Sequence, residues 1–259
     1  MLKGYLAFFS SALQAHLAYS GSLLISLAAS AVGYLITVMI WNYALPDRAE
    51  AHAMFAYLTL GFVMTYITSL FLERSIGERI REGLVATDLL KPVDFQLFYM
   101  VQSLSDLVFQ AVLSLLIMGL GALILGRDLM PASPAALPAF FLSVGLAFLV
   151  QYGISFAFVQ GIFLTNSNYG IFASRQALHQ TFSGVFAPLA MYPPALRAVA
   201  EWLPFQHVVY TPVGIYLGRI QGAAVGRALL EQALWAVALL LGSRLLFKKM
   251  LTKITIQGG

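Results

Sequence analysis

The sequence alternates long apolar runs with short polar segments, and the runs have the length of a membrane-spanning helix. A hydrocarbon core of roughly 30 Å requires about 20 apolar residues. Only 10% of the 259 residues are charged and 60% are apolar, whereas soluble domains are usually about 25% charged. We therefore predict an all-α polytopic membrane protein, with one transmembrane domain over residues 1–259. The six expected spans are 22–43, 53–72, 97–125, 139–164, 170–188 and 228–247.

The N-terminal segment, residues 1–20, has apolar residues near helical spacing among a few polar ones. Two interpretations stay open: an interfacial helix that leads into the first span, or the beginning of one long first helix. A cleaved signal peptide is not favoured, because the apolar run continues as far as Trp41.

The densest charge lies between the second and third expected spans. Residues 73–94 (ERSIGERIREGLVATDLLKPVD) hold nine of the 26 charged residues. An amphipathic helix is expected there, because charged residues cover most of its surface and leave a narrow apolar stripe. Such a helix suits the inner membrane surface and a soluble partner; a solvated loop helix without a partner is the alternative. The stripe consists of Ile76, Ile80, Leu84 and Val85.

Prolines interrupt the chain between the fifth and last spans. A helix broken so often cannot cross the membrane as one rod, and the freed backbone groups must be satisfied by protein, water or head groups. We therefore expect short external or re-entrant helices over residues 188–212. The prolines are Pro188, Pro193, Pro194, Pro204 and Pro212.

The placement of Lys and Arg predicts the orientation. With both termini cytoplasmic, and with Arg244 left uncounted as intramembrane, the inner segments hold nine of these residues and the outer segments five. This agrees with the excess of positive charge on the inner side. The charged segment is then the first cytoplasmic loop, and residues 188–212 face outward. The net charge of +4 is spread over several loops, which suits anionic lipid head groups and argues against nucleic acid as a partner.

Catalytic motifs are missing from the sequence. There is no cysteine, the four histidines are far apart, and neither GxSxG, HExxH nor the ATP-binding pattern GxxxxGK[ST] occurs. No cofactor or metal is therefore expected in this chain, and an enzyme is not favoured. Ionisable residues within the expected spans lie mostly near span ends, where head-group contact accounts for them. They are Asp106, Arg175, His179, Glu231 and Arg244.

Two segments resemble the membrane permeases of ATP-binding-cassette (ABC) exporters of the type-2 class, in the daunorubicin/multidrug-exporter-like subgroup. IREGLVATDLLKPVD (80–94) is similar to that subgroup's first cytoplasmic loop, I-x-x-G-T-L-D-x-L-L-x-R-P-V. Lys91 replaces the usual Arg, and residues 85–87 depart from the pattern. FSGVFAPLAMYPPALRAVAEWLPFQHVVYTPVGIYLG (182–218) is similar to the fifth span, external helices and the run before the last span.

The resemblance implies a permease subunit without an ATPase of its own, in a bacterial inner membrane. It would pair with a second permease, identical or homologous, and with two ATPase subunits that carry ATP and Mg. The charged loop would be the coupling helix, with polar contacts from Arg79, Arg81 and Glu82 and apolar ones from Leu84, Leu89 and Leu90. The implied coupling residues are Glu78, Arg79, Arg81, Glu82, Gly83, Leu84, Asp88, Leu89, Leu90 and Pro92.

The resemblance also implies that residues 188–212 cap the exit side. The gate candidates are Pro188, Tyr192, Pro193, Pro204, Phe205 and Pro212. A function of another class stays open from the residues alone: a non-transporting membrane scaffold that recruits a soluble partner through the charged loop.

Overall fold

The described part of the chain is helical and contains no strand. The structure, a computed structural model, describes residues 2–18, 20–45, 47–70, 72–125, 129–165 and 167–251. The α-helices are α1 (Leu2–Ala18), α2 (Ser20–Ala44), α3 (Arg48–Ile67), α4 (Leu72–Arg81), α5 (Val85–Leu89), α6 (Phe95–Leu125), α7 (Ala136–Thr165), α8 (Asn168–Phe182), α9 (Pro194–Trp202), α10 (Tyr210–Tyr216) and α11 (Ala223–Leu251); the 3₁₀ helices are η2 (Leu189–Met191) and η3 (Pro204–His207).

The long helices follow the expected spans. Within the described ranges, four stretches are long and apolar enough to cross a membrane: Glu50–Arg81, Phe95–Leu115, Ala136–Thr165 and Ala223–Leu251. The 25-residue α2 also has the length of a span, about 37 Å at 1.5 Å per residue. The prediction of an all-α polytopic membrane protein is confirmed.

The fifth predicted span ends earlier than expected. We predicted a helix from Gly170 to Pro188, but α8 stops at Phe182 after 15 residues, which is about 22 Å and too short for the hydrocarbon core. The helix ends because Gly184 adopts a φ of 81°, and a Cβ there would lie 2.9 Å from the hydroxyl oxygen of Tyr57. Residues 183–188 are therefore a non-helical segment inside the bundle.

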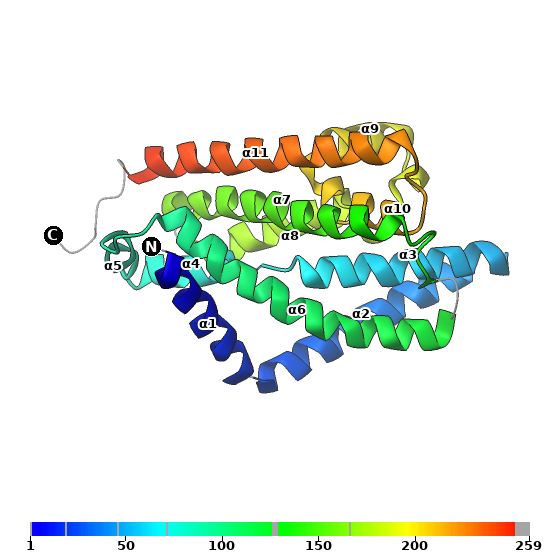
Figure 1. The fold of residues 1–259 in the computed structure, drawn as a ribbon, viewed down its shortest axis with the longest axis horizontal. Helices are drawn as coiled ribbons and strands as arrows, with labels where there is room; N and C mark the ends of the chain where they lie inside the picture. The colour runs from blue at the N-terminus through cyan, green and yellow to red at the C-terminus, as the bar shows by residue number, and fades with distance from the viewer. Residues whose placement is uncertain are drawn as a thin grey trace.

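The N-terminal helix α1 is separate from α2. It inclines away from α2 and meets it at a sharp angle (Figure 1), so the interpretation as one long first helix is wrong. Its Phe8 ring packs edge-on against Phe98 of α6, with 4.9 Å between centroids. Its position relative to the membrane surface stays a prediction.

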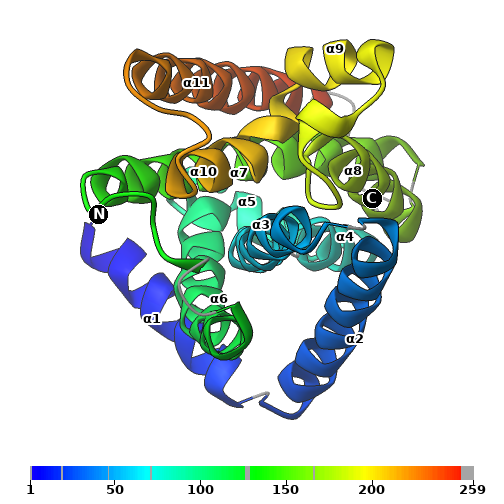
Figure 2. The ribbon, with the colours of Figure 1, turned by 90° about the vertical axis from the view of Figure 1, so that its right-hand side faces the viewer.

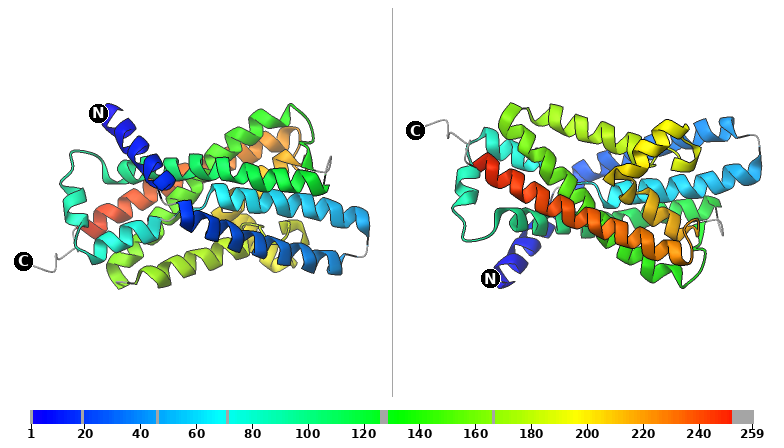
Figure 3. Two further views of the ribbon diagram at one scale, coloured as in Figure 1. Left: turned by 90° about the horizontal axis from the view of Figure 1, so that it is seen from below. Right: turned by 90° about the horizontal axis from the view of Figure 1, so that it is seen from above.

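The most buried long helix is α3, at the centre of the bundle. In the view along the bundle, α2, α6, α7 and α10 lie around it (Figure 2), and α3 packs directly against α2, α6 and α10. Its central residues, such as Tyr57 and Leu58, are fully buried. On one side of the molecule α11 packs against α7 (Figure 3), and the rest of its surface exposes leucines. Those exposed leucines form a surface suited to lipid.

The short helices are sorted to the two ends of the bundle. The start of α1, the α4–α5 segment and the end of α11 lie at one end, and α9 and α10 lie toward the other (Figure 1). Each end has an apolar cluster of its own: one includes Ile76, Val85 and Phe95, and the other includes Val185, Phe205 and Val209. The bundle therefore separates the charged segment from the proline-rich segment.

Candidate functional site

The charged segment folds into two short helices joined at a glycine. Helix α4 ends at Arg81, and Gly83 follows with a φ of 72°, a left-handed conformation that stops the helix. Helix α5 then begins at Val85. Ile76 and Val85 are buried, as the apolar stripe predicts, but Leu84 points outward and is exposed. The prediction of one stripe that includes Leu84 is wrong there, because the turn at Gly83 changes the direction of the chain.

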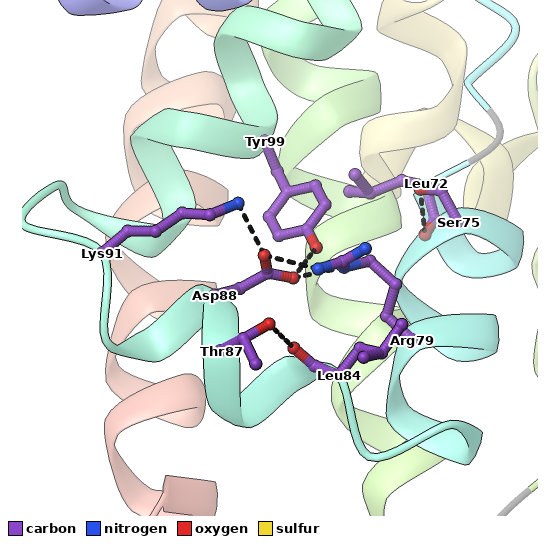
Figure 4. A network of polar contacts seen from close by, with 8 residues as sticks. All are labelled: Leu72, Ser75, Arg79, Leu84, Thr87, Asp88, Lys91 and Tyr99. Atoms are coloured by element: carbon purple, nitrogen blue, oxygen red, sulfur yellow. Dashed lines mark hydrogen bonds and ion pairs between the residues drawn. The ribbon is translucent and has the colours of Figure 1, made fainter.

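A buried carboxylate holds the two helices together. Asp88 of α5 has a fully buried side chain and accepts hydrogen bonds from three residues (Figure 4). Arg79 of α4 donates through Nε and through Nη2, the latter at 2.7 Å; Lys91 Nζ donates at 2.7 Å. The Tyr99 hydroxyl of α6 donates at 2.9 Å. One side chain therefore joins α4, α5 and α6.

The charge on Asp88 is stabilised in spite of its burial. Burial opposes the negative charge, but the hydrogen bonds from Arg79, Lys91 and Tyr99 outweigh it and hold the pKa of the Asp88 carboxyl below its usual range. Arg79 and Lys91 each keep about a third of their side-chain surface exposed, at 33% and 36%. The anion is therefore enclosed, while its two cations face water on their outer sides.

Further contacts fix the loop to its surroundings. Asp94 caps the start of α6 by accepting from the Leu97 N–H at 2.9 Å, and it forms an ion pair with Arg244 of α11. The ammonium group of Lys91 lies 4.4 Å from the centroid of the Phe98 ring, a cation–π contact. The loop thus rests on α6 and α11 as well as on α4.

The outer surface of the loop is a mixture of charge and exposed leucine. Leu84 and Leu89 are each 39% exposed and Leu90 is 84% exposed. Such a group of apolar side chains on a charged loop is typical of a contact surface. The structure thus divides the ten implied coupling residues. Arg79 and Asp88 turn inward; the outward-facing ones are Glu78, Arg81, Glu82, Gly83, Leu84, Leu89, Leu90 and Pro92.

The proline-rich segment is partly inside the bundle and partly outside. Most of η3 and α10 is buried against α7 and α3, whereas every residue of α9 except Ala200 is exposed. The gate candidates divide in the same way. Pro188, Pro204, Phe205 and Pro212 are buried, Tyr192 is half-buried and donates to the Thr181 carbonyl at 2.9 Å, and Pro193 is exposed.

Donors from other helices, one backbone N–H and two side chains, satisfy the non-helical segment after α8. The Ser183 carbonyl accepts from the Tyr210 N–H at 3.1 Å, and the Gly184 carbonyl accepts from the Tyr57 hydroxyl at 2.7 Å. The Phe186 carbonyl accepts from Trp41 Nε1 at 2.9 Å. Irregular backbone at membrane depth needs such partners. Sequence reasoning did not find Tyr57 or Trp41, because both look like ordinary span residues.

A buried ion pair was also missed. Arg175 of α8 and Glu73 of α4 form an ion pair in which the side chains are 3% and 0% exposed. Head-group contact, the expectation for Arg175, is therefore wrong: the guanidinium group is inside the protein because a carboxylate from another helix meets it. Among the described residues, no group of three or more His, Asp or Glu side chains is arranged to hold a metal ion.

The fold and the loop define a class: a helical membrane protein with a polar loop held by a buried carboxylate at one end and an interrupted, proline-rich segment toward the other. The sequence model of the ABC-2 family transporter proteins matches residues 50–258, and the chain belongs to this family. It is thus a membrane permease of the ABC-2 type, a family whose membrane proteins generally work with ATPase subunits. No curated protein matches the chain.

Proposed function

We propose that this chain is the membrane-spanning half of an ATP-driven exporter, in which two permease chains form the path and two separate ATPase subunits drive it. The observation that carries the proposal is the surface of the charged loop: exposed Leu84, Leu89 and Leu90 on a turn that Asp88 holds rigid. The second permease is identical or homologous. ATP and Mg are bound by the partner subunits, and this chain holds no cofactor.

The loop has the properties that a coupling element needs. A push from an ATPase reaches the spans only if the loop does not absorb it, and a flexible linker would absorb it. Here Asp88 joins α5 to α4 and α6, so a displacement of α5 carries both neighbouring helices as rigid bodies. The three leucines give apolar anchors, while Arg81 and Glu82 lie beside them and give polar contacts.

The proline-rich segment is the exit side in this proposal. The buried part, η3 and α10, lies within the bundle, and the exposed part, α9, lies at the edge of the molecule, toward the end opposite to the loop. We propose that residues 188–212 close the path there and open when the spans move. The orientation that follows places both termini and the charged loop in the cytoplasm of a bacterial cell, with the chain in the inner membrane.

Co-purification with an ABC ATPase encoded by a neighbouring gene tests the coupling surface. The variant replaces Leu89 and Leu90 with Ser, and Leu196→Ser is the matched control, because Leu196 is an exposed leucine of α9 at the opposite end. Two buried leucines contribute about 2–4 kcal/mol to an interface, so the double variant should reduce the bound ATPase at least about thirtyfold. Equal binding of the ATPase by all three proteins would contradict the proposal and favour a scaffold.

The orientation is tested by cysteine labelling from the two sides of the membrane. The chain contains no cysteine, so Ser133→Cys and Lys248→Cys each introduce a single thiol at an exposed position. A membrane-impermeant maleimide added to intact cells should label residue 133 after removal of the outer membrane, and residue 248 only after the inner membrane is opened. Labelling of both positions from the same side would refute the orientation.

A further inference from the structure

Helix α8 is the part of the bundle that contacts both the charged loop and the exit side. At its beginning, α8 packs against α4 so closely that a Cβ on Gly77 would overlap the amide of Asn168. At its middle, Arg175 meets Glu73 of α4. At its end, the chain passes into the segment held by Tyr57, Trp41 and Tyr210. A single short helix thus touches both functional ends.

The Glu73–Arg175 pair joins two buried charges. Both side chains are almost completely enclosed, Ser155 of α7 lies beside the carboxylate, and the Phe172 ring lies 5.5 Å from the guanidinium carbon. Removing two charges from water is costly, so a buried pair adds little net stability. Breaking it by removing one partner is strongly unfavourable, because the other charge is left buried. The pair therefore fixes which position α8 takes against α4.

Contacts connect α8 to the charged loop through α4 and to the segment that follows Phe182. Glu73 lies at the start of α4, which Arg79 and Asp88 join to the loop. From Arg175 to the end of α8 is about 10 Å at 1.5 Å per residue. The next residues are those whose carbonyls are held by α2, α3 and α10. A shift of α4 that keeps the pair intact must therefore move the segment after α8.

We propose that α8 transmits movement between the charged loop and the exit side, and that Glu73 and Arg175 are the residues that position α8 against α4. Neither residue contacts a cargo or nucleotide in this mechanism. The pair transmits the position of α4 to residues 183–192. The link between α4 and residues 183–192 is inferred from the fold. Its use in transport rests on the proposed function.

A buried reporter cysteine tests whether the Glu73–Arg175 pair holds the segment after α8 in place. Ala187→Cys places the only thiol of the chain at a buried position just after the interrupted segment, so labelling by a maleimide measures how often that segment opens. In the full chain in lipid nanodiscs, Glu73→Gln and Arg175→Gln should each speed labelling at least about tenfold, equivalent to about 1.4 kcal/mol. The charge exchange E73R/R175E should bring the rate back to within about threefold of the parent.

The matched control is Arg74→Gln. Arg74 is the neighbour of Glu73 on α4 and also takes part in an ion pair, but that pair, with Glu78, is exposed. Its loss should leave the labelling of residue 187 unchanged. If the single variants do not fold, Gly77→Val forces α4 away from Asn168 without changing charge and should speed labelling by a similar factor. Unchanged labelling in the folded variants, or no recovery in the charge exchange, would overturn the proposal.

A second readout separates this inference from the proposed function. In the complex with the ATPase, ATP should change the labelling rate of residue 187 in the parent and should not change it in Glu73→Gln, whereas ATPase binding should be equal in both. Labelling measured without ATP does not involve the ATPase. If the Glu73–Arg175 pair does not position α8, this labelling stays the same in the variants; if the chain is not an exporter, only the response to ATP is missing. An ATP response of the same size in Glu73→Gln would show that α8 does not carry movement from the loop to residues 183–192, and would overturn the inference.

Discussion

Replacement of Asp88 by Asn tests whether the buried carboxylate holds the loop. Asn keeps the shape of the side chain and still accepts from Tyr99, but it loses the charge that attracts Arg79 and Lys91. Hydrogen bonds to a charged group contribute about 1.5–3 kcal/mol each. The two cations keep about a third of their surface in water and regain solvation when released, so the full sum does not apply. We expect a loss of about 2–3 kcal/mol in the local stability of the loop.

Limited proteolysis measures this loss directly. Trypsin cleaves after Arg81 only when the loop opens, and when opening and closing are fast the cleavage rate follows the open population. A loss of about 2–3 kcal/mol corresponds to roughly 30- to 150-fold faster cleavage. The measurement uses purified full-length protein in nanodiscs and follows the two fragments over time at pH 7.5.

Asp94→Asn is the matched control in the same segment. Asn is as good a helix cap as Asp, and the ion pair between Asp94 and Arg244 is partly exposed, worth about 1 kcal/mol at most. Cleavage should therefore rise less than about sixfold. Equal acceleration by the two variants, or less than threefold acceleration by Asp88→Asn, would refute the account of Asp88 as the residue that holds the loop.

Two further predictions concern the loop and the segment after α8. The lowered pKa of Asp88 means that its contribution to loop stability is fully present above the unfolded pKa of about 4 and is lost as the pH falls through the lower folded pKa; hydrogen exchange of residues 82–91, corrected for the intrinsic rate, should accelerate only in that acidic window, and not in Asp88→Asn. Tyr57→Phe leaves the buried Gly184 carbonyl without its donor, a cost of about 1–3 kcal/mol, and should speed labelling of Cys at position 187 at least about fivefold. Tyr34→Phe, which removes a hydroxyl bonded to Thr59, is its control and should change that rate less than twofold.

Hydropathy and proline placement predicted most of the fold. Runs of apolar residues determine which helices are long, because a helix in a membrane must be apolar over its whole length. The ends of the fifth span could not be predicted in this way. Residues 183–187 are apolar or small, and what ends α8 is the conformation of Gly184 together with donors from Trp41 and Tyr57, which lie more than 120 positions earlier.

The charged loop was located by sequence, but its internal arrangement was not. Amphipathic spacing assumes one continuous helix, and the turn at Gly83 breaks that assumption. The inward direction of Asp88 depends on Tyr99, a residue of the next helix, so no local pattern reveals it. The local sequence shows only that Asp88 is the single charged residue in VATDLL. Glu73 and Arg175, 102 positions apart, show no local signal either.

The arrangement of the loop also determines how its variants must be interpreted. Arg79 and Asp88 determine the shape of the loop, while Glu82 and Leu90 face outward and are free to meet a partner. A double replacement of Arg79 and Glu82 would therefore change a residue of each kind, and a loss of ATPase binding would have two causes. Because a partner surface acts only when its support is rigid, proteolysis after Arg81 has to accompany every binding measurement. Only a variant that keeps the parent's cleavage rate and loses the ATPase reports on the contact itself.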